Sequence, residues 1–174
     1  MTDGAPGIDP VRLKAYFALI EVSSLLRHAI EQQLRDAGSL SYVQFQLLAT
    51  LGDRPDGRAR MTDLADGVVY SRSGITYQAG LLERAGLVAR GPAEDDERST
   101  MVTITEAGRA RLAAVFPGHL EALQRLLLDP MSDQDVRALA DVLGRVRAHM
   151  HRQPPRSAAP RRGAGARRSD GADG

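Results

Sequence analysis

The sequence predicts a mainly helical protein that carries a small β-hairpin, and three observations support this fold class. Apolar residues recur at helical spacing through most of residues 9–151. Two short helical segments, near residues 62–68 and 71–85, follow one another across a tight turn. Two runs rich in valine, isoleucine and threonine come next, with a polar stretch between them. Together these features predict a winged helix-turn-helix flanked by further helices.

The composition fits a folded protein without cysteine chemistry. Apolar residues make up 43% of the chain, and no apolar run approaches the roughly 18 residues that a membrane span needs. The absence of cysteine excludes disulfides, thiolate zinc sites and thiol redox switches. The first residues have neither the basic start nor the apolar stretch of an export signal. We therefore expect a cytoplasmic protein with no membrane partner.

Charge is distributed unevenly along the chain. Residues 1–150 hold 17 basic and 20 acidic residues, whereas residues 151–174 hold six arginines and two aspartates. The segment 152–174 has no apolar periodicity, and we expect it to be a disordered basic tail. Because the rest of the chain is mildly acidic, affinity for a nucleic acid has to come from a local patch.

The first elements precede the two short helices. Residues 9–37 have the apolar spacing of one long helix that ends at Gly38. Ser41 is a favourable N-cap for a second helix, which stops at Gly52. Residues 52–60 are rich in Gly, Pro and Asp, and we expect a loop there.

The second short helix is the candidate for nucleic-acid contact. Ser71 is expected to cap it and Gly86 to end it, while Ile75, Ala79 and Leu82 share an apolar face directed at the core. The opposite face carries hydroxyl, guanidinium and amide groups, from Ser71, Arg72, Ser73, Thr76, Tyr77 and Gln78. Such groups at a helix N-terminus suit phosphate contact, and the amide of Gln78 suits adenine. The alternative is an ordinary capped surface helix.

The predicted hairpin follows at once. Strand-like residues 87–90 and 101–105 flank a polar turn at residues 91–98, which carries four carboxylates and Arg98. We expect Arg98 to extend into a narrow minor groove, with Asp96 holding its guanidinium in place. The alternative is a solvated charged turn.

Two more helices complete the prediction. The first begins at Glu106, with Pro117 as an expected bend or break, and Ser132 with Asp135 resembles a capping box for the second. The last helix, ending near His151, carries an apolar seam of Val136, Leu139, Leu143, Val146 and Met150. A winged domain at residues 41–108 has little surface to cover this seam. We expect residues 9–37 and 109–151 to be dimerisation helices; packing within one chain is the alternative.

Signatures of enzymes are missing from the sequence. It has no glycine-rich phosphate loop after a strand, no HExxH motif and no GxSxG motif. His149 and His151 are two positions apart, which does not place them on one face of a helix. We therefore expect no catalytic residues, no metal ligands and no cofactor.

The segments described above resemble the MarR family of bacterial regulators over about residues 10–150. The similarity is densest at Leu64-Ala65, Ser71-Arg72-Ser73, Ile75-Thr76, Leu82-Glu83 and Gly86-Leu87-Val88, and in the wing at Asp96, Arg98, Thr105 and Gly108. The resemblance implies a homodimer on a palindromic operator in double-stranded DNA, with the second short helix in the major groove and Arg98 in the minor groove. It also implies a repressor more often than an activator, released by a small, often aromatic effector bound between the dimerisation helices and the winged domain.

Departures from the family pattern limit what the resemblance implies. Tyr77 stands where the family often has arginine, and Val69-Tyr70 stand where the turn often has glycine, so base preference does not carry over. The aromatic residues Tyr16, Phe17, Phe45 and Phe116 are candidates either for an effector pocket or, as is more usual, for the core. The alternative function is a winged-helix protein-interaction module that does not bind DNA.

Overall fold

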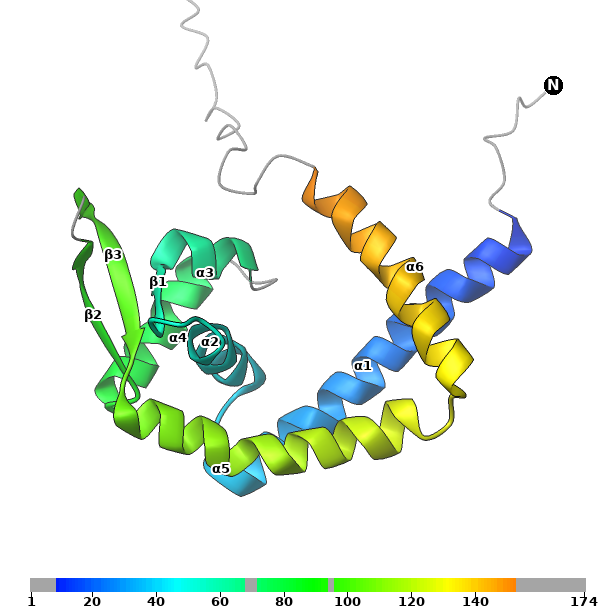
Figure 1. The fold of residues 1–174 in the computed structure, drawn as a ribbon, viewed down its shortest axis with the longest axis horizontal. Coiled ribbons are helices and arrows are strands. Elements are labelled where there is room, and N and C mark those ends of the chain that lie inside the picture. The colour runs from blue at the N-terminus through cyan, green and yellow to red at the C-terminus, as the bar shows by residue number, and fades with distance from the viewer. Residues whose placement is uncertain (1–8, 68–71, 94–95, 153–174) are drawn as a thin grey trace, which may run out of the picture.

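The computed structural model describes residues 9–67, 72–93 and 96–152. Its elements are α1 (Pro10–Gly38), α2 (Tyr42–Gly52), β1 (Arg58–Arg60), α3 (Met61–Gly67), α4 (Arg72–Arg84), β2 (Val88–Ala93), β3 (Asp96–Ile104), α5 (Glu106–Leu123), the π-helical turn η1 (Gln124–Leu128) and α6 (Asp133–His151). In Figure 1, α2, α3, α4 and the sheet form one lobe, and α1, α5 and α6 extend away from it. This is the mainly helical fold with a small β-wing that the sequence predicts.

Helix α2 lies at the centre of the winged lobe. Its Leu47, Leu48 and Leu51 are at most 1% exposed. The predicted apolar face of α4 packs in the same lobe, since Ile75, Ala79 and Leu82 are at most 2% exposed. Burial of these side chains holds α4 in place with its other face directed outward.

Local capping signals fix several helix ends as predicted. The Ser41 hydroxyl accepts the N–H of Gln44 at 3.2 Å, and the Gln44 side chain accepts the N–H of Ser41 at 3.0 Å. Ser132 and Asp135 form the equivalent capping box on α6, and the hydrogen bonds from Ser132 lower the pKa of Asp135. Gly86 adopts a φ of 71°, which favours glycine, and ends α4.

The sheet has three antiparallel strands in the order β1-β3-β2. The prediction of a plain loop at residues 52–60 was therefore wrong at its end, because Arg58–Arg60 pair with residues 101–103 of β3. Ala59, opposite Val102, is 2% exposed. A strand of this length has too few residues to show an alternating pattern, and it forms because β3 offers a partner edge.

The hairpin differs from the prediction in its strand lengths. Both strands extend into residues 91–98, which were expected to form the turn, so Arg98 lies in β3 and not in the turn. Pro92 pairs with Thr100 but Ala93 pairs with Asp96, and residues 97–99 of β3 therefore fall at a break in the register. Such irregularities extend one strand past its partner and change its direction locally.

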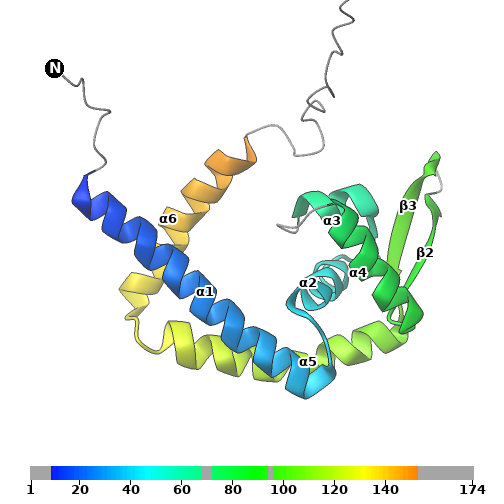
Figure 2. The same cartoon turned by 180° about the vertical axis from the view of Figure 1, so that it is seen from behind.

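Helix α5 passes through Pro117, so of the expected bend or break the break was wrong, and the bend stays a prediction. Proline inside a helix costs about 3 kcal/mol because it removes a hydrogen bond and crowds the preceding turn. Packing on α1 opposes this cost: the Gln33 amide donates a hydrogen bond to the Val115 carbonyl at 3.2 Å. Gly118 lies so close to Gln33 that an added Cβ would be 2.7 Å from its Nε2. Figure 2 shows α1 crossing α5 in this region.

Large apolar side chains remain exposed on the three outer helices. Helix α6 has no buried residue, and its Leu143, Val146 and Met150 are 38%, 47% and 66% exposed. On α1, exposed apolar side chains run from Val11 to Leu25. No helix of the described residues is long and apolar enough to cross a membrane.

Candidate nucleic-acid interface

The outer face of α4 is polar, as its sequence predicts. Ser73 and Thr76 are exposed, and Tyr77 is 62% exposed. Of the other residues predicted for this face, Ser71 lies outside the described residues. Arg72 begins α4, but its side chain is not among those that the structure describes. The described side chains offer two hydroxyls and a phenol to a surface that approaches α4.

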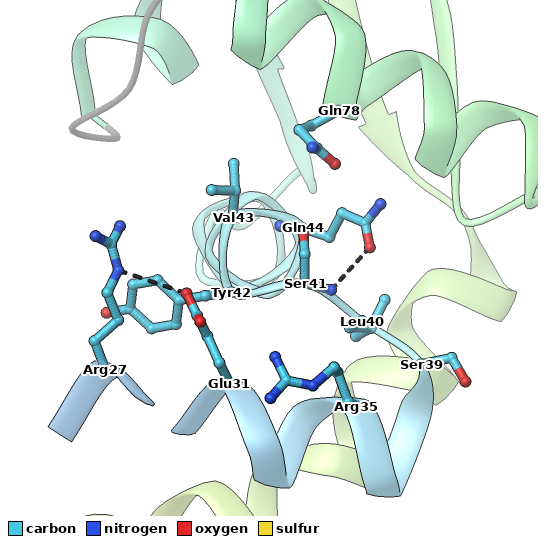
Figure 3. Close-up of a pocket in the computed structure, with 10 residues that line it drawn as sticks. All are labelled: Arg27, Glu31, Arg35, Ser39, Leu40, Ser41, Tyr42, Val43, Gln44 and Gln78. Carbon is cyan, nitrogen blue, oxygen red and sulfur yellow. Dashed lines mark hydrogen bonds and ion pairs between the residues drawn. The ribbon is translucent and has the colours of Figure 1, made fainter. Parts of the chain in front are cut away.

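Gln78 departs from the prediction of an exposed side chain. It is only partly exposed, and its Oε1 is buried without a hydrogen-bond partner. In Figure 3 it points from α4 toward the first turn of α2. Helix geometry explains why Tyr77 is exposed and Gln78 only partly so. Neighbouring side chains of an α-helix point about 100° apart, and Gln78 is therefore turned toward α2. A position next to an exposed one is therefore at the margin of the outer face.

Gln78 lines a pocket between α1, α2 and α4 with a volume of about 740 Å³. Helix α1 supplies Arg27, Glu31 and Arg35, and residues 39–44 supply the rest of the lining (Figure 3). Arg27 lies over the Tyr42 ring, 5.4 Å from its centroid, and its Nε is 3.7 Å from the Glu31 carboxylate. The pocket thus contains one guanidinium group stacked over an aromatic ring and a second, that of Arg35, elsewhere in its lining.

The pocket lies between a predicted dimerisation helix and the winged domain, where the family resemblance implies an effector, but its lining residues were not predicted. The four aromatic residues considered as a ligand box are not among its described lining residues: Phe45 is buried in the core, and Tyr16, Phe17 and Phe116 lie exposed on other faces. A signal was present, since Arg27, Glu31 and Arg35 recur every fourth residue and so share one face of α1. Their meeting with α2 and α4 depended on the tertiary fold.

The predicted wing residues Asp96 and Arg98 lie at the start of β3. Asp96 is exposed and accepts a hydrogen bond from the Ser99 hydroxyl at 2.7 Å. The backbone of Arg98 lies between these two residues, but its side chain is not among those described. Its predicted contact with Asp96 therefore stays a prediction. Among the described residues, no group of three or more His, Asp or Glu side chains is placed to hold a metal ion.

Comparison with known proteins identifies the family. A family model described as the MarR family matches residues 39–99. The chain is 30% identical over 142 residues to the HTH-type transcriptional repressor YetL of Bacillus subtilis, covering 80% of this chain and 84% of YetL. The chain belongs to the MarR family. It is also 30% identical over 146 residues to the transcriptional regulator PecS of Dickeya dadantii, covering 83% and 87% of the two chains.

A solved structure agrees with the MarR assignment. The fold is similar to that of the MarR family regulator Sco3205 of Streptomyces coelicolor, solved in complex with DNA. The TM-score is 0.79 at 25% identity, covering 88% of this chain and 94% of Sco3205. The curated relatives YetL and PecS are both regulators of transcription.

Proposed function

We propose that this MarR family protein is a homodimeric transcriptional repressor that binds a palindromic operator. Helix α4 enters the major groove through Ser71, Arg72, Ser73, Thr76 and Tyr77, and the wing reaches the minor groove through Arg98 with Asp96 as its support. The observation that carries the proposal is the exposed polar face of α4 beside the wing. The DNA complex of Sco3205 and the repressor YetL support it.

The dimer follows from the apolar surface of the outer helices. A helix such as α6, with an apolar seam and no buried residue, gains its stability from packing that a single chain does not give it. A two-fold partner covers the seam of α6 and the exposed apolar side chains of α1 at once. It also places two copies of α4 about one helical turn of DNA apart, which fits a palindrome.

The pocket between α1, α2 and α4 is the proposed effector site. Its volume lies in the range of small-molecule sites, about 300–1,000 Å³, and Arg27, Arg35 and the Tyr42 ring suit an aromatic molecule that carries a negative charge. A bound effector contacts α4 through Gln78 and so shifts the helix that faces DNA. Base reading by Gln78 stays a competing prediction.

A binding titration tests the proposed function. Fluorescence anisotropy compares a duplex from the region upstream of the protein's own gene with a random duplex of the same length, at several salt concentrations. We expect tighter binding of the upstream duplex, and a salt slope that falls by about 1 in Arg72→Ala. Absence of binding to either duplex at low salt overturns the proposal and favours the protein-interaction module.

A further inference from the structure

An ion pair joins α4 to the wing. The Nε of Arg90, on β2, donates to Oε2 of Glu83, in the last turn of α4, at 2.8 Å, and the Nη2 of Arg90 contacts the same oxygen. This pairing lowers the pKa of Glu83. An added Cβ at Gly80 would lie 3.8 Å from Arg90 Nη2, so the guanidinium lies against α4 over its last turns.

The location of this pair argues against a role in stability alone. The two side chains are 36% and 29% exposed, and solvent screens ion pairs at such surfaces, so that they add little to stability. A carboxylate in the last turn of a helix is also unfavourable next to the helix dipole, so Glu83 does not favour the helix by itself. The useful property of the pair is the geometry that it fixes.

The structure shows what the pair restrains. In β2, Val88 and Ala93 are buried and the four residues between them are exposed. Arg90 lies in that exposed part, and its side chain contacts Glu83 on α4. A hollow beside it is lined by Gly91, Pro92, Ser99 and Thr100. Val88 belongs to the core cluster and holds the base of the wing, and the ion pair joins the exposed middle of β2 to α4.

We propose that Glu83 and Arg90 are positioning residues that set the spacing between α4 and the wing on DNA. This inference rests on the proposed function, since that spacing decides whether α4 and Arg98 reach adjacent grooves together. Neither Glu83 nor Arg90 has to contact DNA in this role. A direct phosphate contact by Arg90 is the competing explanation, and it makes an opposite prediction for the charge-swapped protein.

The experiment measures operator affinity for four proteins: wild type, Glu83→Gln, Arg90→Gln and the swap Glu83→Arg with Arg90→Glu. Each single variant is expected to weaken binding about fivefold or more, the lower end of a lost groove contact. The swap is expected to restore most of the affinity, although it places a carboxylate at position 90. Urea unfolding midpoints are expected to stay unchanged. Arg145→Gln, which breaks the exposed pair with Asp141 on α6, is the matched control and leaves affinity unchanged.

The outcomes separate the possibilities. If the swap binds more weakly than both single variants, Arg90 contacts phosphate directly and the positioning role is overturned. Single variants that bind like wild type overturn it as well, while the proposed function stands. A wild type that binds no DNA overturns the proposed function, and the positioning role with it. A double-mutant cycle adds an independent test: the loss from Arg90→Gln shrinks in an Arg98→Ala background if the pair acts through the wing.

Discussion

The hydroxyl of Thr105 donates a hydrogen bond to the carbonyl oxygen of Gly86 at 2.7 Å. The same hydroxyl accepts the N–H of Gly108 at 3.0 Å and caps α5. One side chain thus ties the end of α4 to the start of α5. Gly108 lies against the same connection, since an added Cβ there would be 2.1 Å from the Leu87 carbonyl oxygen. This contact gives a structural reason for the Thr105 and Gly108 of the wing signature.

Gly108→Ala is expected to lower the free energy of unfolding by about 1–3 kcal/mol, because the methyl group forces backbone atoms apart. Urea denaturation measures the change. Gly80→Ala in α4 is the matched control, since its Cβ would meet nothing closer than 3.7 Å, and it gains up to about 1 kcal/mol of helix propensity. Equal stability of the two variants would contradict the steric argument.

Leu143→Asp combined with Val146→Asp is expected to give monomers or unfolded chains. Each side chain loses about 1.5–3 kcal/mol of burial when it no longer packs across the dimer, and two charges enter the interface. Analytical ultracentrifugation measures the oligomeric state. Arg145→Ala changes an exposed residue of the same helix and is expected to remain dimeric. A wild-type protein that sediments as a monomer at micromolar concentration would refute the dimer.

Arg98→Ala is expected to weaken operator binding by about 1–3 kcal/mol, the scale of a groove contact. The midpoint of thermal unfolding is expected to change little, because residues 97–99 lie at the break in the strand register. Asp96→Ala is expected to cost less, since it loosens the arginine without removing it. Anisotropy titrations measure both, with Arg147→Ala on α6 as the control. Operator binding by Arg98→Ala equal to that of wild type would exclude a reading role for the wing.

Gln78→Ala separates the two roles considered for this residue. If Gln78 faces the effector pocket when DNA is bound, the variant keeps its operator preference but responds differently to effector. If Gln78 reads a base, the variant loses preference at one base pair in each half-site. Titrations with operator duplexes substituted at single positions, with and without an aromatic acid such as benzoate, distinguish these results. We expect the first result, because Gln78 lines the pocket and is only partly exposed on the outer face of α4.

Stability is expected to fall as the pH drops below about 6.5, with His119 as one cause. Its ring lies 4.6 Å from that of Phe45, and burial lowers the pKa of His119 from its ordinary value of 6.5. The unfolded chain therefore takes up a proton at a higher pH than the folded one. The loss of stability begins at the unfolded pKa and ends at the lower folded pKa. Urea unfolding between pH 5 and 8 should show a weaker pH dependence for His119→Gln than for the wild type.

The sequence alone determined the features that depend on neighbours within a few residues. Ser41 caps α2 and Ser132 forms a capping box with Asp135, as expected from residues at most three positions apart, and Gly86 ends α4 because it adopts a positive φ. The apolar face of Ile75, Ala79 and Leu82 follows from helical periodicity. These local signals were sufficient to predict the order of the main helices and of the wing hairpin, and the polar outer face of α4, but not strand β1.

The tertiary structure decided the features whose partners are distant in sequence. Strand β1 exists because β3 pairs with it, and α5 continues through Pro117 because Gln33 and the rest of α1 pack there. Gln78 faces a pocket because α1 brings Arg27 and Arg35 opposite α4. Bringing distant segments together costs conformational entropy, and only the burial of the whole core offsets that cost. Which segments meet therefore depends on the complete fold and cannot be predicted from a local sequence pattern.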